Sequence, residues 1–342
     1  MNPLPFVSIL IPARNESAYI AETLRAAAQQ THPKDLYEII VADGMSTDDT
    51  REKITQFAAQ NKIPRVQVLE NSKQTMPCGF NLALRAASGE IIVMMSAHAQ
   101  MAENYLERCV AFLDAHPEAA CVGGQVETIA PDVSGQAIAL AMSSPFGVGN
   151  AAFRTGLARA APADSAVFAA YRKSVFQTFG GLDEEMTRNQ DDEFNYRVRE
   201  RGGIIYSSPE IRSMYFSRAS LKGLWKQYYQ YGFWKVRVLQ KHPRQMSLRQ
   251  FVPPIFVLSL LGSILLILFP VLRPLSSFIP MLYLLANLSA SMYAASKHGW
   301  KYAPMLPLIF TILHISYGLG FLMGLFKFWN RWGDRTGKVP ML

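Results

Sequence analysis

The sequence predicts an α/β domain built on a mostly parallel sheet, followed by an α-helical membrane region. Its first half alternates short apolar runs with segments of helical spacing, and its second half holds three long uncharged runs. The charge changes in step with this pattern. Of 34 Lys and Arg residues 15 lie from residue 218 onward, with one of the 26 acids, so this part carries +14 and the preceding part −6.

Four runs in the first half have the character of buried parallel strands, because they are short, rich in β-branched residues and almost uncharged. They are Phe6–Ile11, Tyr37–Ala42, Val66–Leu69 and Glu90–Met95. Segments of helical spacing follow the first three strands, over residues 18–30, 48–61 and 78–87. This alternation predicts a doubly wound sheet that binds ligands at the carboxyl ends of its strands. The first strand lacks a G-x-G-x-x-G motif after it, which argues against a nicotinamide cofactor.

Three runs in the second half are long enough to cross a membrane. Residues 250–272, 274–296 and 302–326 form uncharged runs of 23, 23 and 25 residues, and a membrane helix needs about 20. The alternative is that these runs are buried helices of a large soluble protein. Three such runs in series argue against this alternative. A turn at Arg273–Pro274 predicts that the first two runs form a hairpin. The third run contains Pro304 and Pro307, so we expect two firm crossings, a third irregular segment and a cytosolic basic tail.

Aromatic and basic residues alternate between the two halves, over residues 221–242. This pattern predicts an amphipathic helix in the membrane interface, with a surface helix of the catalytic domain as the alternative. Because basic residues flank apolar runs, they indicate membrane lipids as partners and no nucleic acid. We therefore expect a catalytic domain over 1–217, an interface segment over 218–249 and a transmembrane region with a basic tail over 250–342. The sequence leaves the oligomeric state unknown.

Two strand ends carry a recognisable motif. The first strand ends in Ile11-Pro12-Ala13-Arg14-Asn15-Glu16, and the second in Val41-Ala42-Asp43-Gly44-Met45-Ser46-Thr47-Asp48-Asp49-Thr50. This pair resembles the opening signature of family-2 glycosyltransferases, which have the GT-A nucleotide-diphospho-sugar transferase fold. Residues 164–172, 180–184 and 189–197 resemble exopolysaccharide glycosyltransferases of the succinoglycan-biosynthesis type. In that subgroup a Gln-Tyr-rich segment and a short membrane region follow the catalytic domain.

The resemblance implies a nucleotide-sugar donor, with a UDP-sugar as the expectation. A carboxylate at the end of a parallel strand accepts hydrogen bonds from a uracil N–H or a ribose hydroxyl, and Glu16 and Asp43 occupy the matching positions. Turn and cap chemistry is the alternative for both. Lys73, after the third strand, is a candidate for pairing with a donor phosphate. The full predicted donor-binding set is Pro12, Ala13, Glu16, Asp43, Lys73, Ser96 and Ala97.

The fourth strand ends in Met94-Met95-Ser96-Ala97-His98, where the family carries Asp-x-Asp and the subgroup often has Asp-Ala-His. In the family, the last residue of this motif helps to hold a divalent cation against the diphosphate. His98 is therefore the predicted metal ligand, through a neutral imidazole. Because Ser96 replaces the first acid, the site favours Mn²⁺ over Mg²⁺, which prefers oxygen ligands. Weak metal dependence is the alternative.

The inverting mechanism of the family needs a carboxylate to deprotonate the acceptor hydroxyl. Aligning Gln190-Asp191 with the usual Glu-Asp places this base at Asp191, with Asp192 as the competitor in register. Acids that complement a helix dipole are the alternative interpretation. Gly181 and Asp183, in the stretch Gly180-Gly181-Leu182-Asp183-Glu184, match a family loop near the acceptor, so the predicted acceptor residues are Gly181, Asp183 and Asp192.

The resemblance thus implies an inverting hexosyltransferase in the plasma (inner) membrane, multi-pass, with its catalytic domain in the cytoplasm. It would transfer sugar to a lipid-linked saccharide acceptor during exopolysaccharide or cell-surface glycan assembly. Two alternatives stay open. One is a polyprenyl-phosphate sugar transferase, and the other is a catalytically inactive member that serves as a membrane assembly subunit, for which Ser96 is the best argument.

Overall fold

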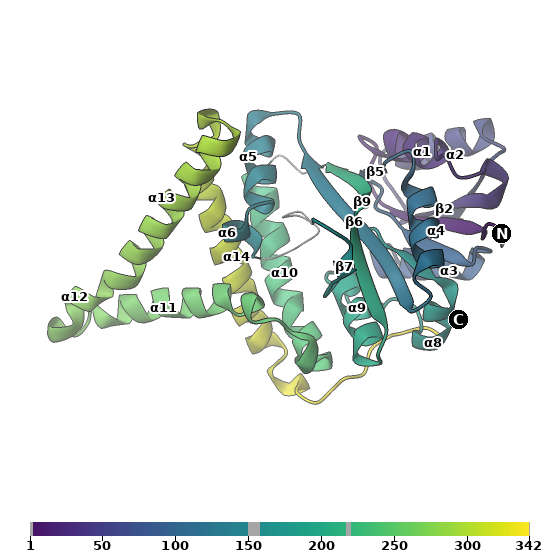
Figure 1. Ribbon diagram of the computed structural model, residues 1–342. Coiled ribbons are helices and arrows are strands. Elements are labelled where there is room, and N and C mark those ends of the chain that lie inside the picture. The colour runs from purple at the N-terminus through teal and green to yellow at the C-terminus, as the bar shows by residue number, and fades with distance from the viewer. Residues whose placement is uncertain (1–2, 150–157, 217–219, 342) are drawn as a thin grey trace. The chain divides into compact units, whose positions relative to one another are not determined.

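The computed structural model describes residues 3–149, 158–216 and 220–341, which divide into two compact units (Figure 1). The first unit consists of residues 3–127, 158–216 and 335–341, and the second of residues 128–149 and 220–334. This division differs from the predicted boundaries in three segments. Residues 128–149 and the predicted interface segment belong with the apolar helices, and the end of the basic tail belongs with the sheet.

The first unit is built on a mixed sheet with the strand order β3-β2-β1-β4-β8-β6-β9-β5. β1 (Val7–Ala13), β2 (Tyr37–Asp43), β3 (Arg65–Glu70) and β4 (Ile91–Met94) pair in parallel, at the four predicted strand positions. Helices α1 (Ile20–Ala28), α2 (Thr50–Gln60) and α3 (Met76–Ala86) connect them, as expected from the helical spacing.

The remaining strands bring antiparallel pairing to the sheet. β8 (Ala170–Arg172) pairs antiparallel with both β4 and β6 (Ala119–Ile129), and β9 (Ile204–Phe216) pairs antiparallel with β5 (Ala99–Met101) and β7 (Ala161–Pro162). The helices of this part are α4 (Tyr105–Ala115), α8 (Lys173–Phe179) and α9 (Gln190–Glu200).

Both faces of the sheet are buried, which explains why its parallel strands are apolar throughout. Val7, Ile9 and Ile11 of β1 pack in one core with α1, α2 and α4. Leu10 of the same strand points to the other core, with α3, α8 and α9. Cys78, Cys109 and Cys121 are buried free thiols.

The second unit is α-helical. It contains α5 (Val133–Met142), α6 (Pro145–Val148), α10 (Leu221–Lys241), α11 (Val252–Leu266), α12 (Arg273–Ser276), α13 (Phe278–His298) and α14 (Leu306–Lys327). Within the residues that the structure describes, three segments are long and apolar enough to cross a membrane: Leu248–Leu266, Pro270–His298 and Leu306–Lys327. α11 and α13 leave the α12 turn in different directions, so the predicted hairpin is open (Figure 1).

α14 corrects one expectation, because it is a continuous helix of 22 residues rather than an irregular segment. Pro307 lies in its first turn, where proline is compatible with a helix. Its glycines permit close packing on α10: a Cβ on Gly320 would lie 2.0 Å from the Tyr229 carbonyl oxygen, and one on Gly324 2.5 Å from that of Phe233. Both contacts advance by four residues, so α14 runs parallel to α10.

α10 forms over the predicted amphipathic segment, but part of its basic face is covered. Lys222 and Lys226 are exposed, whereas Lys235, Arg237 and Lys241 are buried. The Arg237 guanidinium donates to Gln240 Oε1 at 2.7 Å and lies 3.6 Å from Asp334 Oδ2. The buried half of α10 therefore stabilises the second unit.

Polar residues inside the apolar helices bond to one another. His314 contacts the Tyr283 hydroxyl at 3.0 Å and the Phe146 carbonyl oxygen at 2.8 Å. Asn287 donates to Thr311 Oγ1 at 3.0 Å. These bonds connect α6, α13 and α14, which agrees with the rule that polar groups in apolar helices face protein.

Candidate active site

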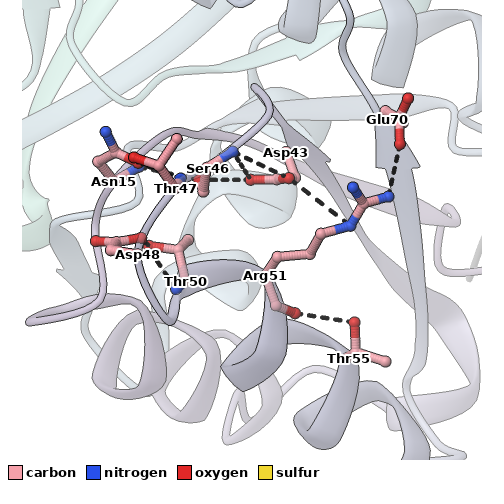
Figure 2. A network of polar contacts seen from close by, with 9 residues as sticks. All are labelled: Asn15, Asp43, Ser46, Thr47, Asp48, Thr50, Arg51, Thr55 and Glu70. Carbon is pink, nitrogen blue, oxygen red and sulfur yellow. Dashed lines mark hydrogen bonds and ion pairs between the residues drawn. The ribbon is translucent and has the colours of Figure 1, made fainter.

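The carboxyl ends of β1 and β2 lie side by side and their loops are joined by hydrogen bonds (Figure 2). Ala13 pairs with Asp43 in the parallel register, and Asn15 follows in the first loop. The Asn15 amide N–H donates to Ser46 Oγ at 3.0 Å, and Asn15 Oδ1 accepts from the Thr47 N–H at 2.9 Å. We call the residues shown in Figure 2, apart from Thr55, the strand-end network: Asn15, Asp43, Ser46, Thr47, Asp48, Thr50, Arg51 and Glu70.

Asp43 is at the centre of this network and is completely buried. Its Oδ1 accepts from the Ser46 hydroxyl at 2.6 Å, and Arg51 Nε lies 4.0 Å from Oδ2. Arg51 also pairs with Glu70 at 2.7 Å, which raises the pKa of the guanidinium. The buried carboxylate is thus matched by the hydroxyl and the backbone N–H of Ser46 and by the Arg51 cation, as buried charges require.

Glu16 is oriented by the second loop. Its amide N–H donates to Thr50 Oγ1 at 2.7 Å, and that hydroxyl donates to Asp48 Oδ1. Asp48 also accepts from the Ser17 N–H at 3.2 Å. Desolvation opposes ionisation of Asp48, but the hydrogen bonds from Thr50 and Ser17 outweigh it and lower the pKa of its carboxyl to about 2.

The Glu16 side chain contacts the predicted metal ligand. Glu16 Oε1 lies 3.0 Å from His98 Nδ1, and Ser96 Oγ lies 3.2 Å from the same nitrogen. The His98 ring also makes an edge contact with Tyr215, with ring centroids 5.1 Å apart. Among the described residues no group of three His, Cys, Asp or Glu side chains could hold a metal. One imidazole and one carboxylate fit a divalent cation whose other ligands come from a diphosphate and water.

Lys73, a predicted donor ligand, is paired with an acid of the predicted acceptor loop. Its Nζ lies 2.6 Å from Glu184 Oε2, and Asn81 Nδ2 lies 3.3 Å from Glu184 Oε1. Desolvation opposes ionisation of Glu184, but the hydrogen bonds from Lys73 and Asn81 outweigh it and lower the pKa of the carboxyl. The hydrogen bond to Glu184 raises the pKa of the Lys73 ammonium group. Lys73 remains largely exposed, so it is accessible to a ligand.

Asp191 and Asp192 lie in the first turn of α9 and are half-buried. Tyr171 is close to Asp191: burial raises the pKa of its hydroxyl well above the usual value, and the charge of Asp191 contributes to this. The helix is preceded by Asn189 in a left-handed conformation with φ 58°. Acids in the first turn complement the helix dipole, so position alone does not assign Asp191 a catalytic role.

Residues 180–184 form a loop, here called the 180–184 loop, and side chains of two helices hold it in place. Asn81 of α3 exchanges two hydrogen bonds of 2.8 Å with the Leu182 backbone. Arg197 of α9 donates to the Gly181 carbonyl oxygen at 2.9 Å and pairs with Glu193 at 2.9 Å. Asp183 is completely buried, and its Oδ1 accepts from the Glu185 N–H at 3.0 Å. Asp183 thus helps to fix this loop, and its predicted contact with the acceptor stays a prediction.

The structure brings together some predicted residues and adds others. Pro12, Ala13, Glu16 and Asp43 lie at adjacent strand ends, with Ser96, Ala97 and His98 following β4, and Lys73 meets the loop that contains Gly181 and Asp183. Sequence reasoning missed Ser46 and Arg51 as partners of Asp43, and Asn15 as the residue that joins the two loops, although all three lie in or next to the recognised motif. Asn81 carried no local signal, because its partner Leu182 is 101 residues away. Arg197 has Glu193 one helical turn before it, but that pair does not reveal its bond to the Gly181 carbonyl oxygen.

Comparison with known proteins gives one family match and two relatives that align over nearly the whole chain. Residues 8–180 match the model of the family described as Glycosyl transferase family 2. Succinoglycan biosynthesis protein ExoA of Rhizobium meliloti is 28% identical over 331 residues, which cover 94% of this chain and 96% of that protein. A protein of Methanococcus voltae is 26% identical over 329 residues, 94% of this chain and 98% of its own length. It is dolichyl N-acetyl-alpha-D-glucosaminyl phosphate 3-beta-D-2,3-diacetamido-2,3-dideoxy-beta-D-glucuronosyltransferase.

A solved structure has a similar fold. Mannosyltransferase PcManGT from Pyrobaculum calidifontis, in complex with GDP-Man and Mn²⁺, superposes with a TM-score of 0.59 at 19% identity. The match covers 95% of this chain and 88% of that one. At this identity the likeness concerns the fold alone.

Proposed function

The chain belongs to glycosyl transferase family 2 and is a glycosyltransferase with the GT-A fold; from this premise we propose that it transfers a hexose, with inversion, from a UDP-sugar to a lipid-linked saccharide. The observation that carries the proposal is the group of side chains at the ends of β1, β2 and β4. There Asp43 is buried beside Ser46, and Glu16 lies 3.0 Å from His98. Ligands of open α/β sheets bind at this edge.

The reaction needs one proton transfer and one displacement. The carboxylate of Asp191 would take the proton of the acceptor hydroxyl while the hydroxyl oxygen forms a bond to the anomeric carbon of the donor sugar. The bond from that carbon to the donor phosphate breaks on the opposite face, and the nucleoside diphosphate leaves with the electron pair. General-base assistance contributes about 10²–10⁴-fold to such a step. Lys73 would neutralise part of the charge on the leaving diphosphate.

A divalent cation would add to this neutralisation. His98 and Glu16 are the residues that would hold it, since an imidazole nitrogen and a carboxylate oxygen are acceptable ligands for Mn²⁺. When bound, the ion supplies positive charge to the diphosphate. Ser96 in place of an acid leaves this protein with fewer negative ligands than the family pattern, so we propose a weakly held metal.

Relatives support a lipid-linked saccharide as the acceptor over polyprenyl phosphate itself. The name of the Methanococcus voltae relative states that its acceptor is a dolichyl-phosphate-linked sugar, and the Rhizobium meliloti relative takes part in succinoglycan biosynthesis. The three apolar segments would keep the enzyme at the membrane where such acceptors reside.

We further propose that the catalytic unit is cytoplasmic, at the plasma membrane, and that the C-terminus lies on the same side. The tail supports this: the Gly181 N–H donates to the Pro340 carbonyl oxygen at 2.8 Å, within the first unit. A chain that leaves and rejoins this unit crosses the membrane an even number of times. α10 carries five cations, which oppose its insertion across the membrane, and α14 packs along it. We therefore assign both crossings to the α11–α13 hairpin.

Topology is testable by labelling intact cells with a membrane-impermeant maleimide, since the three natural cysteines are buried. We expect a cysteine at Leu275→Cys, in the hairpin turn, to be labelled from outside. A cysteine added after Leu342 should react only after permeabilisation. Labelling of the added C-terminal cysteine in intact cells would contradict the arrangement.

The activity itself is tested with the full-length protein in its membrane and a panel of UDP- and GDP-sugars. We expect transfer from one or more UDP-sugars to an extracted lipid-linked saccharide, with the opposite anomeric configuration in the product by NMR. Retention of configuration would contradict the single-displacement mechanism. Transfer to polyprenyl phosphate alone would favour the alternative product.

A further inference from the structure

The C-terminal segment 338–341 pairs with the 180–184 loop. The Glu184 N–H donates to the Lys338 carbonyl oxygen at 2.9 Å, and the Gly181 N–H donates to the Pro340 carbonyl oxygen at 2.8 Å. In return the Lys338 N–H donates to Asp183 Oδ1 at 2.8 Å. The tail thus satisfies two backbone donors of the loop and one oxygen of a buried carboxylate.

The loop sequence is adapted to this contact. Gly180 has φ +77°, and a Cβ there would lie 2.6 Å from Val339 Cγ1 and 3.1 Å from the Pro340 carbonyl oxygen. A Cβ on Gly181 would lie 2.4 Å from Asn81 Oδ1. A side chain at Gly180 would therefore displace the tail, and one at Gly181 would displace Asn81. The consecutive glycines allow the loop to be held from both sides.

The loop transmits this contact to residues of the proposed mechanism. Glu184, whose N–H is bound by the tail, holds Lys73 at 2.6 Å. The Gly181 carbonyl oxygen accepts from Arg197 of α9, the helix that begins with the proposed base. A displacement of the loop would thus alter the positions of both Lys73 and α9.

We propose that segment 338–341 is a positioning element of the active site, which fixes the 180–184 loop and through Glu184 the side chain of Lys73. The role of Lys73 towards the diphosphate rests on the proposed function. The segment follows the last apolar helix, so the chain returns from the membrane region to complete the catalytic unit. Because the contact to Asp183 is charge-assisted, its loss is expected to lower the equilibrium constant for ordering of the loop about tenfold or more.

The test removes one backbone hydrogen-bond donor. Lys338→Pro removes the N–H that binds Asp183, whereas Lys338→Ala keeps it and trims an exposed side chain. Full-length variants are compared for UDP affinity by calorimetry, with UDP alone as the probe. We expect UDP to bind Lys338→Pro about five- to tenfold more weakly than wild type, and Lys338→Ala within twofold.

A double-mutant cycle separates positioning from general destabilisation. In a Lys73→Ala background, Lys338→Pro should have little further effect on UDP affinity, because the side chain that it positions is gone. Full additivity of the two effects would overturn the proposal, as would wild-type affinity in Lys338→Pro. Should this variant fail to fold, a protein that ends at Gly337 takes its place.

Amide hydrogen exchange gives a readout that needs no nucleotide. The Gly181 and Glu184 amides should exchange at least tenfold faster in Lys338→Pro, but not in Lys338→Ala. Amides around Lys73 should also exchange faster in Lys338→Pro. Unchanged protection around Lys73 would overturn the coupling. If the wild type binds no UDP, the donor proposal fails, and exchange still decides whether the tail orders the loop.

Discussion

The strand-end network and the 180–184 loop are both fixed by polar contacts, but over very different sequence distances. In the network, Asn15 and Glu16 bond to partners 31 to 34 residues away. In the loop, Asn81, Lys73 and Lys338 reach partners 101, 111 and 155 residues away. The first is a local unit built at the ends of three consecutive strands, β1, β2 and β3, whereas the second is assembled from α3, α9 and the C-terminal tail. We therefore expect the network to govern nucleotide binding and the loop with α9 to govern transfer.

The largest expected effect is at α9. Asp191→Asn removes the proposed base and keeps its size, so transfer should fall at least about 100-fold while UDP affinity changes by no more than a few-fold. Turnover by the purified variant and calorimetry with UDP measure the two effects. Asp192→Asn is the matched control, with activity within about tenfold. If Asp191→Asn retains more than about a tenth of the turnover, the base is another residue.

The metal proposal sharpens the comparison on the strand-end side. A chelator should suppress turnover, and His98→Ala should raise the Mn²⁺ concentration needed for half-maximal activity roughly 10- to 100-fold. Free Mn²⁺ in titrations with UDP, followed by electron paramagnetic resonance, reports binding without turnover. His116→Ala, a histidine paired with Glu118 at the surface, serves as the control. Full activity in excess chelator would leave Lys73 to neutralise the diphosphate.

A smaller effect is expected at Asp43. Asp43→Asn removes the charge that faces Arg51 and weakens the bond to Ser46, so UDP should bind about tenfold more weakly. Turnover at saturating donor should stay within twofold. Glu70→Gln perturbs Arg51 from its exposed side and should change affinity by less than a factor of three. A fall in turnover with unchanged UDP affinity would place Asp43 in the transfer step and break the comparison.

The smallest expected effect is the loss of stability that acid causes through Asp48. The pKa of Asp48 is lowered to about 2, so its contribution to stability is fully present above about pH 4 and is lost as the pH falls towards 2. Because Asp48 is exposed, solvent limits this contribution to less than about 1 kcal/mol. Thermal unfolding between pH 6 and 2.5 should show a shallower decline in Asp48→Asn than in wild type. Identical declines would mean that the Asp48 bonds contribute nothing measurable.

Local sequence patterns identified much of the catalytic unit. The four parallel strands and three helices appear at the expected positions because period, burial and composition are local properties of each run. The antiparallel strands β5 to β9 were not foreseen. They are short or paired across long distances, so their partners determine them more than their own residues do.

Hydropathy also identified all three apolar segments of the second unit, yet it could not distinguish their roles. α11 and α13 expose most of their apolar residues, whereas α14 uses Gly320 and Gly324 to pack on α10. Pro304 and Pro307 predicted an irregular segment, but the helix is continuous and its glycines permit close packing.

The sequence by itself determined the family, the sheet edge that carries the acidic residues and the apolar character of the second half, because each depends on neighbouring residues. Tertiary structure alone decided how those residues are partnered: Asp43 buried beside Arg51, Lys73 held by Glu184, and Asp183 bound by the backbone of Lys338. Such partners are chosen by the path of the chain in space, and no local pattern records that residue 338 returns to residue 183.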